Sequence, residues 1–169
     1  MMRVGMGYDV HPFGTEGALV IGGVVIADAP QLVGHSDADV VAHAVADSLL
    51  GPTGLPALGE MFPSSDPAYA GVSSIGLLAE VAAKVAAGAW WVGNVDVVIA
   101  AERPRLAPHV AMMAANISAA LDVAREPGGR ATHVAVRPKR GEGLGFVGRS
   151  EGIAVPLSSN SRTVGCRCA

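Results

Sequence analysis

The spacing of hydrophobic and polar positions divides the chain into segments of two kinds. Short apolar runs typical of strands, most of them rich in β-branched residues, occur at 4–8, 18–27, 94–101, 132–137 and 152–157. Apolar residues recur at helical spacing over 36–51, from 73 or 74 to 88, and in a third segment that follows a turn at 102–109 and ends near 121. Strands thus alternate with helices, the connections are uneven in length, and no repeat is visible.

Turn and cap residues mark the limits of these segments. Gly22-Gly23 predicts a tight turn that divides 18–27 into two short strands, because glycine readily takes a positive φ. The segment 28–34 contains a proline and a glycine and is interpreted as a loop. Ser36 is predicted to be the N-cap of the first helix, with Asp39 three residues later as in a capping box. Gly51-Pro52 is predicted to end that helix.

Three segments lack a clear period. Residues 52–71 are rich in Pro, Gly, Ser and Asp, and they predict a loop long enough to be functional. Residues 139–149 form a glycine-rich basic loop. The tail 158–169 has no apolar period and is predicted to be disordered, so the expected folded domain is 1–157. Cys166 and Cys168 in this tail lie too close together and too near the chain end to staple a fold.

Composition and charge narrow the class of protein. A chain of 169 residues is most simply one domain, and with half of its residues apolar but only 4% aromatic its core is built from small side chains. A net charge of −3 argues against nucleic acid or an anionic membrane surface as the main partner. No apolar run reaches the length of about eighteen residues that spans a membrane, and no signal-peptide stretch is visible, which predicts a cytoplasmic protein.

Candidate metal ligands follow the first strand and lie on the first helix. Asp9 and His11 stand two residues apart, so on an extended backbone their side chains point to the same side. His43 falls one helical turn after Asp39 and one before Asp47. Alone, an Asp-x-His pair also fits a hydrogen bond in a turn, and a helix histidine fits ordinary packing. Together they form a His₂-carboxylate set, which suits zinc with one open coordination position.

Two further stretches could bind anions. His35-Ser36 offers a donor, a hydroxyl and the positive end of a helix dipole, which suit a phosphate, although local evidence alone favours an ordinary helix cap. The loop 139–149 combines three cationic side chains, glycines that expose backbone N–H groups, and one carboxylate, Glu142. Glu142 could hold a Mg²⁺ ion between two phosphates, and a solvated surface turn is the alternative.

Five stretches, taken in order and spacing, resemble one known family. They are RVGMGYDVH at 3–11, HSDADVVAH at 35–43, GNVD at 93–96, RPR at 103–105 and GLGFVGRSEG at 143–152. The chain resembles 2-C-methyl-D-erythritol 2,4-cyclodiphosphate synthase of the non-mevalonate isoprenoid pathway over about residues 2 to 157. Five blocks in register are far more specific than any single motif.

The resemblance implies an α+β domain in which a mixed β-sheet is covered by helices on one face, and a homotrimer assembled around packed sheets with active sites at the subunit interfaces. The implied reaction converts 4-diphosphocytidyl-2-C-methyl-D-erythritol 2-phosphate into the cyclic diphosphate and CMP. The implied metals are Zn²⁺, or another divalent transition metal, at Asp9, His11 and His43, and Mg²⁺ or Mn²⁺ at Glu142 with the substrate diphosphate. Small molecules and further copies of the chain are the expected partners, with no nucleic acid and no membrane.

The resemblance also implies the remaining site residues. His35 and Arg140 are the implied catalytic residues. The implied substrate contacts are Val10, Ser36, Ala57, Leu58, Gly59, Phe62, Pro63, Ser64, Ser65, Asp66, Ala101, Glu102, Arg103, Pro104, Arg105, Leu106, Ala107, Lys139, Gly141, Phe146 and Arg149.

Three stretches depart from the family pattern. An aspartate that holds the substrate's hydroxyl groups in the family is Ala57 here, and a run of three threonines before the glutamate is Lys139-Arg140-Gly141. The family's Phe-Pro-Asp-Thr-Asp is FPSSD at 62–66. A guanidinium at Arg140 can stabilise phosphoryl charge in place of a hydroxyl, whereas Ala57 has no such compensation. Three hypotheses therefore remain: a working synthase, a metal- and cytidine-nucleotide-binding homologue with weak or no cyclase activity, or another phosphoryl-transfer enzyme.

Overall fold

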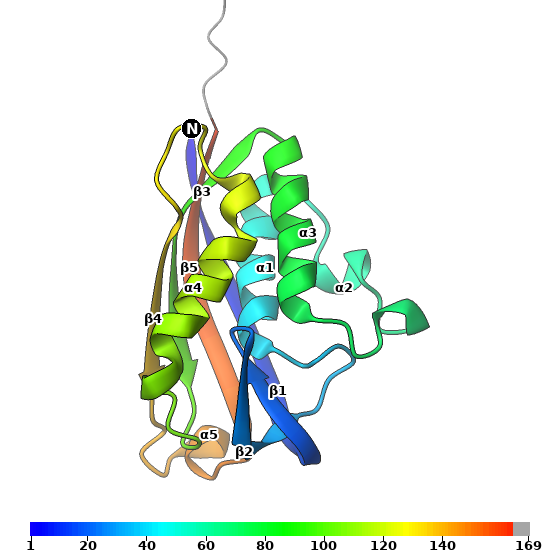
Figure 1. Ribbon diagram of the computed structural model, residues 1–169, viewed down its shortest axis with the longest axis vertical. Helices are drawn as coiled ribbons and strands as arrows, with labels where there is room; N and C mark the ends of the chain where they lie inside the picture. Colours follow the sequence, from blue (N-terminus) through cyan, green and yellow to red (C-terminus); the bar gives the residue numbers. More distant parts are fainter. Residues whose placement is uncertain (164–169) are drawn as a thin grey trace, which may run out of the picture.

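A five-stranded mixed sheet organises the computed structural model, which describes residues 1–163 (Figure 1). The strands are β1 (Met2–Ile21), β2 (Val24–Leu32), β3 (Trp90–Ala100), β4 (His133–Lys139) and β5 (Gly152–Thr163). Their order is β2-β1-β5-β3-β4, in which β3 and β4 run parallel and the other neighbours antiparallel. This confirms the expected α+β class with a mixed sheet.

The turn at the tip of the first hairpin has the predicted conformation. Gly22 and Gly23 take φ of 56° and 69° and connect β1 to β2. The interpretation of 28–34 as a loop is wrong as far as Leu32, because β2 continues along β1 and pairs Leu32 with Phe13. A proline is tolerated there since β2 is an edge strand, whose outer side needs no backbone donor.

The predicted disorder after residue 157 is wrong for residues 158–163. Strand β5 continues to Thr163 in the middle of the sheet, where Ser159 pairs with Gly5 of β1 and with Val95 of β3. A central strand is stabilised by backbone hydrogen bonds on both sides, so it does not need an apolar side-chain period. Residues 164–169, with both cysteines, lie outside the described residues.

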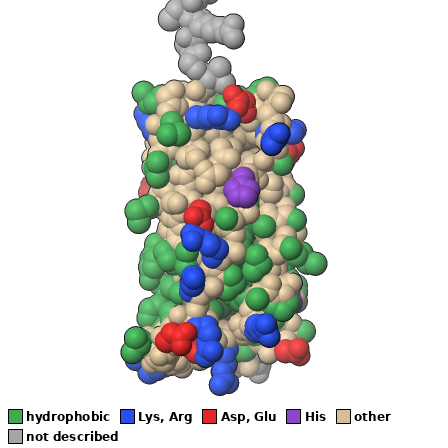
Figure 2. Space-filling view, turned by 90° about the vertical axis from the view of Figure 1, so that its left-hand side faces the viewer, with side chains coloured by type: hydrophobic (Ala, Val, Ile, Leu, Met, Phe, Trp, Pro, Cys, Tyr) green, Lys and Arg blue, Asp and Glu red, His purple; other side chains and the backbone are tan. Residues whose placement is uncertain are grey.

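Three helices cover one face of the sheet: α1 (Val40–Thr53), α3 (Ser74–Ala87) and α4 (Val110–Ala120). Helix α1 packs on β1 and β5, α4 packs on β4, and α3 packs against α1 and α4 (Figure 1). The opposite face of β1 is open and apolar. Its exposed side chains are Met2, Val4, Met6, Tyr8 and Val10. Figure 2 views the molecule from the side away from the helices, where hydrophobic side chains lie among charged ones.

Helix α1 begins and ends later than the sequence predicts. Asp39, not Ser36, is the N-cap, and its carboxylate accepts the N–H groups of Val41 and Ala42. At the other end Pro52 lies inside the helix instead of ending it. Proline lacks the N–H that would bond to the carbonyl four residues earlier. That carbonyl, of Ser48, instead accepts the hydroxyl of Ser159 on β5.

The connections contain short helical turns. They are α2 (Leu58–Met61), α5 (Gly145–Gly148) and three 3₁₀ turns, η1 (Pro67–Tyr69), η2 (Ala107–His109) and η3 (Asp122–Ala124). Residues 52 and 53 of the predicted loop 52–71 belong to the end of α1. Apart from α2 and η1, the rest of this loop is irregular. In the described part of the chain, no helix has the length and hydropathy needed to cross a membrane.

Glycines on the inner face of β1 let α1 approach closely, and we expect Gly7→Ala to destabilise the fold. A Cβ at Gly7 would collide with the backbone carbonyl of Ala44 in α1 and lie 3.2 Å from Cβ of Ser48. Overpacking of this kind costs about 1–3 kcal/mol in the free energy of unfolding, which urea denaturation would measure.

Gly51→Ala in α1 is the matched control for this prediction. A Cβ at Gly51 meets nothing within 4 Å, so the exchange should leave stability unchanged or raise it by up to about 1 kcal/mol through helix propensity. Equal stability of the two variants would contradict the proposed contact between β1 and α1.

Candidate active site

Asp9, His11 and His43 come together where β1 meets α1. Oδ2 of Asp9 lies 3.2 Å from Nδ1 of His11 and 3.2 Å from Nδ1 of His43. Each residue offers a ligand atom within 4.8 Å of the other two, and all three are partly buried. The expectation that Asp9 and His11 point to the same side of the strand is confirmed, and His43 supplies the third member.

The electrostatics of this cluster fit a divalent cation. Burial by itself would raise the pKa of the Asp9 carboxyl, but the neighbouring imidazoles of His11 and His43 outweigh burial and hold the pKa well below its usual range. Nδ1 of His11 is buried and makes no hydrogen bond, because its approach to Asp9 lacks the geometry of one. A carboxylate that stays ionised and an imidazole nitrogen without a partner are what a bound metal would satisfy.

A cavity of about 280 Å³ lies beside the two histidines. It is lined by His11, His35, Ser36, His43, Leu58, Gly59, Phe62, Ser64, Tyr69 and Leu77. Predicted residues from the first strand, the start of α1 and the loop 52–71 therefore share one space. His35 is exposed and its Nε2 lies 3.1 Å from the carbonyl oxygen of Asp66, while Val10 is exposed on β1.

The loop beside this cavity is held by short turns. Ala57 is exposed and occupies the N-cap position of α2, where its side chain makes no capping bond. The N–H of Leu58 donates instead to the carboxylate of Asp47 in α1. Asp66 caps the turn η1 by accepting the N–H of Ala68, and Pro63 and Ser65 lie in the same loop. The predicted residues of 57–66 thus lie along one segment, and Leu58, Gly59, Phe62 and Ser64 of this segment line the cavity beside His11 and His43.

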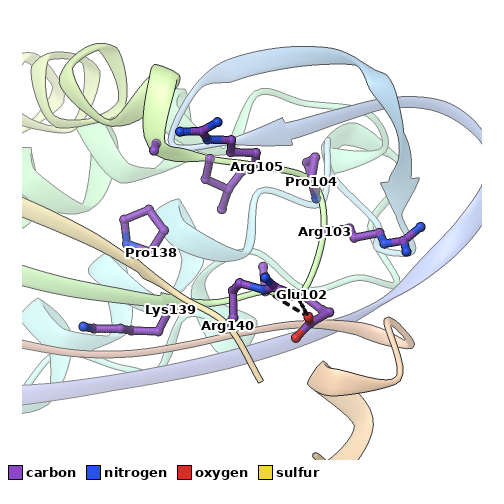
Figure 3. A pocket seen from close by; sticks show the side chains of 10 residues that line it. Glu102, Arg103, Pro104, Arg105, Pro138, Lys139 and Arg140 are labelled. Carbon is purple, nitrogen blue, oxygen red and sulfur yellow. Dashed lines mark hydrogen bonds and ion pairs between the residues drawn. The ribbon is translucent and has the colours of Figure 1, made fainter. Parts of the chain in front are cut away.

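A second cavity, of about 530 Å³, lies at the ends of the parallel strands β3 and β4. It is lined by Ala101, Glu102, Arg103, Pro104, Arg105, Leu106, Ala107, Pro138, Lys139 and Arg140, so all seven residues of the predicted segment 101–107 contribute. Arg103 and Arg105 extend in opposite directions from the loop in Figure 3. This cavity shares no lining residue with the cavity beside the histidines.

An ion pair joins two residues that line the second cavity. Nε of Arg140 donates to Oε1 of Glu102 at 3.0 Å (Figure 3). The backbone N–H of Gly141 donates to Oε2 at 3.0 Å. The hydrogen bond from Arg140 holds the pKa of the Glu102 carboxyl below its usual value, and the same pair raises the pKa of Arg140. Glu102 therefore fixes the start of the glycine-rich loop against the segment 101–107.

The rest of the glycine-rich loop faces solvent. Glu142 is exposed with a φ of 51°, and it is not part of the Asp9-His11-His43 cluster. Phe146 lies on α5 and is 37% exposed. Arg149 is exposed and pairs with Glu151, with Nε of Arg149 2.7 Å from Oε1. The structure does not test the metal-binding role predicted for Glu142 or the substrate contacts predicted for Phe146 and Arg149, and these roles stay predictions.

Several residues of this region were not identified as functional from the sequence, among them Leu77 in the lining of the first cavity. Pro138 lines the second cavity and Tyr69 lines the first, where its ring packs edge-on against Phe62 with centroids 5.3 Å apart. Ser74 is buried at the start of α3 and lies 2.9 Å from Nε2 of His43. The sequence offered no signal for Ser74 beyond the start of a helix.

Comparison with known proteins identifies relatives across nearly the whole chain. Residues 2–158 match the model of the YgbB family. The chain is 47% identical over 155 residues to a 2-C-methyl-D-erythritol 2,4-cyclodiphosphate synthase of Bordetella avium, and the match covers 92% of each chain. It is 52% identical over 153 residues to a bifunctional enzyme IspD/IspF of Anaeromyxobacter sp., where the match covers 90% of this chain and 38% of the relative. The chain thus spans well under half of that bifunctional relative.

Solved structures share the fold. The structure described as the IspF (Plasmodium falciparum) CDP complex matches with a TM-score of 0.78 and 27% identity, over 96% of each chain. That protein was therefore solved with a cytidine nucleotide bound.

Proposed function

The chain belongs to the YgbB family, and from this premise we propose that it is a 2-C-methyl-D-erythritol 2,4-cyclodiphosphate synthase. The observation that carries the proposal is the cluster of Asp9, His11 and His43 beside a cavity, together with a second cavity in the segment 101–107. In the proposed reaction a 2-phosphate oxygen of the substrate attacks the β-phosphorus. A P–O bond forms to close the ring, and the P–O bond to CMP breaks.

Asp9, His11 and His43 would hold Zn²⁺ or another divalent transition metal. When bound in this way, such an ion supplies a Lewis acid for a phosphate oxygen of the substrate. His35 and Ser36 line the same cavity and would contact that phosphate. The chain's task is to align the attacking oxygen with the leaving group and to neutralise developing charge, which requires no nucleophilic side chain.

The second cavity would take the cytidine nucleotide. Its lining combines the segment 101–107 with the cationic Lys139 and Arg140, which suits a base joined to phosphates. Arg140 is exposed in its pair with Glu102, and exposed ion pairs exchange readily with solvent and anions. We assign Arg140 the charge-stabilising role of the missing threonine. Glu142 would hold Mg²⁺ or Mn²⁺ between the nucleotide phosphates.

The open face of the sheet supports assembly as a homotrimer. Five apolar side chains of β1, from Met2 to Val10, are exposed on the face that carries no helix. A contiguous apolar surface of this kind is typical of a protein–protein interface. A trimer packed through these sheets would also let the two separate cavities of neighbouring subunits meet in one active site. Location in the cytoplasm remains a prediction.

The direct test is turnover. Incubation with 4-diphosphocytidyl-2-C-methyl-D-erythritol 2-phosphate, Zn²⁺ and Mg²⁺ should yield CMP and the cyclic diphosphate in equal amounts. Both products are measured by ³¹P NMR. Binding of CMP without turnover would contradict the synthase and support a nucleotide-binding homologue. Formation of CMP without the cyclic product would indicate another phosphoryl transfer.

The alanine at position 57 favours the second candidate, a homologue that binds metal and nucleotide with weak cyclase activity. No carboxylate at this position can hold the substrate's hydroxyl groups. We expect Ala57→Asp to raise kcat/KM about tenfold or more, because a hydrogen bond to a charged group contributes about 1.5–3 kcal/mol. The same carboxylate would cap α2, so steady-state kinetics should be accompanied by a thermal melt.

Ala70→Asp is the matched control, since Ala70 is exposed at the end of the turn η1 in the same long segment. It should leave kcat/KM unchanged. A gain in stability for Ala57→Asp without a gain in kcat/KM would show that the carboxylate only caps α2.

A further inference from the structure

Ser74 connects the start of α3 to the proposed metal ligand on α1. Its side chain is buried, and its Oγ lies 2.9 Å from Nε2 of His43 and 2.5 Å from Oδ1 of Asp37. Oγ of Ser36 lies close to the same histidine, at 3.0 Å from Nε2 of His43, and 2.9 Å from Oγ of Ser74. The Nε2 side of the His43 ring thus faces two hydroxyl oxygens, while its Nδ1 side faces Asp9.

Asp37 determines where the proton of Ser74 goes. Its carboxylate accepts the backbone N–H of Ser74 through both oxygens, at 3.1 Å each, and the N–H of Asp39 at 3.3 Å. A carboxylate only accepts hydrogen bonds, so the hydroxyl of Ser74 must be the donor in its contact with Asp37. A hydroxyl carries a single proton, and that proton is therefore directed away from His43.

The oxygen of Ser74 is then available to His43 only as an acceptor. In the metal-free protein Nδ1 of His43 can donate to Oδ2 of Asp9 at 3.2 Å, while Nε2 accepts from Ser36 Oγ at 3.0 Å. A metal ion held by Nδ1 would exclude that arrangement and leave the ring proton on Nε2, which lies 2.9 Å from the accepting Ser74 Oγ. With a proton on Nε2, each contact among Asp37, Ser74 and His43 joins one donor to one acceptor. The hydrogen bond made by one ring nitrogen of a histidine sets the state of the other nitrogen.

We infer that Ser74, held by Asp37, is a positioning residue that stabilises the Nε2–H tautomer of His43, the tautomer needed for Nδ1 to hold a metal ion. Nδ1 of His43, the atom 3.2 Å from Oδ2 of Asp9, is then unprotonated and able to act as a metal ligand. The inference rests on the metal centre of the proposed function and extends it to the start of α3. Partners of this kind usually change metal affinity by about 10- to 100-fold when they are removed.

The test combines a spectrum with a metal affinity. Long-range ¹H–¹⁵N correlation of ¹⁵N-histidine-labelled, zinc-loaded protein reports the tautomer of each ring, and His43→Ala identifies the His43 signals. Zinc affinity is measured by competition with a chromophoric chelator. We expect the Nε2–H tautomer in the wild-type protein and about 10- to 100-fold weaker zinc binding in Ser74→Ala.

Ser73→Ala is the matched control, because Ser73 is the adjacent exposed residue and its side chain makes no capping bond. It should bind zinc within about twofold of the wild type, well inside the range expected for loss of such a partner. A wild-type His43 in the Nδ1–H tautomer would overturn the inference even if Ser74→Ala did not fold, and so would unchanged zinc affinity in a folded Ser74→Ala. Failure of the wild-type protein to bind zinc would instead contradict the metal centre itself.

Discussion

Replacing His43 with alanine is expected to reduce cyclase activity at least about a thousandfold. Loss of this ligand would weaken binding of the metal ion, which is proposed to act as a Lewis acid on a phosphate oxygen of the substrate. Only three described residues form the cluster, so the remaining Asp9 and His11 would leave too few protein ligands for a tetrahedral site. Zinc content after dialysis, and CMP release under saturating substrate, would both be measured.

His133→Ala separates this effect from a general loss of histidine. His133 is exposed on β4, away from the lining of both cavities, and its removal should leave activity and zinc content unchanged. His43 is only partly buried, so urea unfolding of His43→Ala should show a folded protein. More than a tenth of the wild-type activity in a zinc-free His43→Ala protein would refute the assigned metal centre.

Asp39→Ala is expected to have the largest effect on stability. The carboxylate is fully buried and accepts four backbone N–H groups, two from the first turn of α1 and two from Gly22 and Gly23 at the hairpin tip. Losing an N-cap costs about 1 kcal/mol and leaving a buried N–H without a partner costs about 1–3 kcal/mol, so we expect a total of about 3 kcal/mol. Urea denaturation would measure this loss in the free energy of unfolding.

Asp28→Ala is the matched control, because Asp28 is exposed on β2 in the same hairpin. Its effect should stay within about 0.5 kcal/mol, as for most surface substitutions. If Asp39→Ala cost less than about 1 kcal/mol, the carboxylate would not be what joins the hairpin tip to α1. Faster amide hydrogen exchange in the first turn of α1 and at Gly22 and Gly23 would support the assigned contacts.

Local chemistry explains which parts of the fold were predictable. The helix 74–87, the turn at Gly22-Gly23 and the strand 94–100 depend on nearby residues, through apolar period, glycine conformation and β-branched side chains. The metal cluster was predictable in the same way for Asp9 and His11, because two residues on an extended strand share a side. That His43 lies beside Asp9 and His11 was predicted because the three residues form a His₂-carboxylate ligand set and because of the family resemblance.

Long-range contacts account for the expectations that were wrong. Residues 158–163 carry a polar pattern typical of a disordered tail, and only pairing with both β1 and β3 makes them a central strand. Pro52 is tolerated inside α1 because the carbonyl of Ser48, which it leaves without a helical donor, accepts a hydrogen bond from the hydroxyl of Ser159. Ser159 lies 111 positions further along the chain. No local pattern contains that partner.

The sequence by itself determined the chemistry of this protein, since the identity and spacing of Asp9, His11, His43 and the segment 101–107 set the kinds of ligand it can hold. The tertiary structure alone decided how those side chains are oriented. Asp39 rather than Ser36 caps α1, so Ser36 is free to contact His43, which Ser74 approaches from the start of α3. Hydrogen bonds are short and directional, so whether a serine caps a helix or holds a histidine depends on distances that only the packed chain provides.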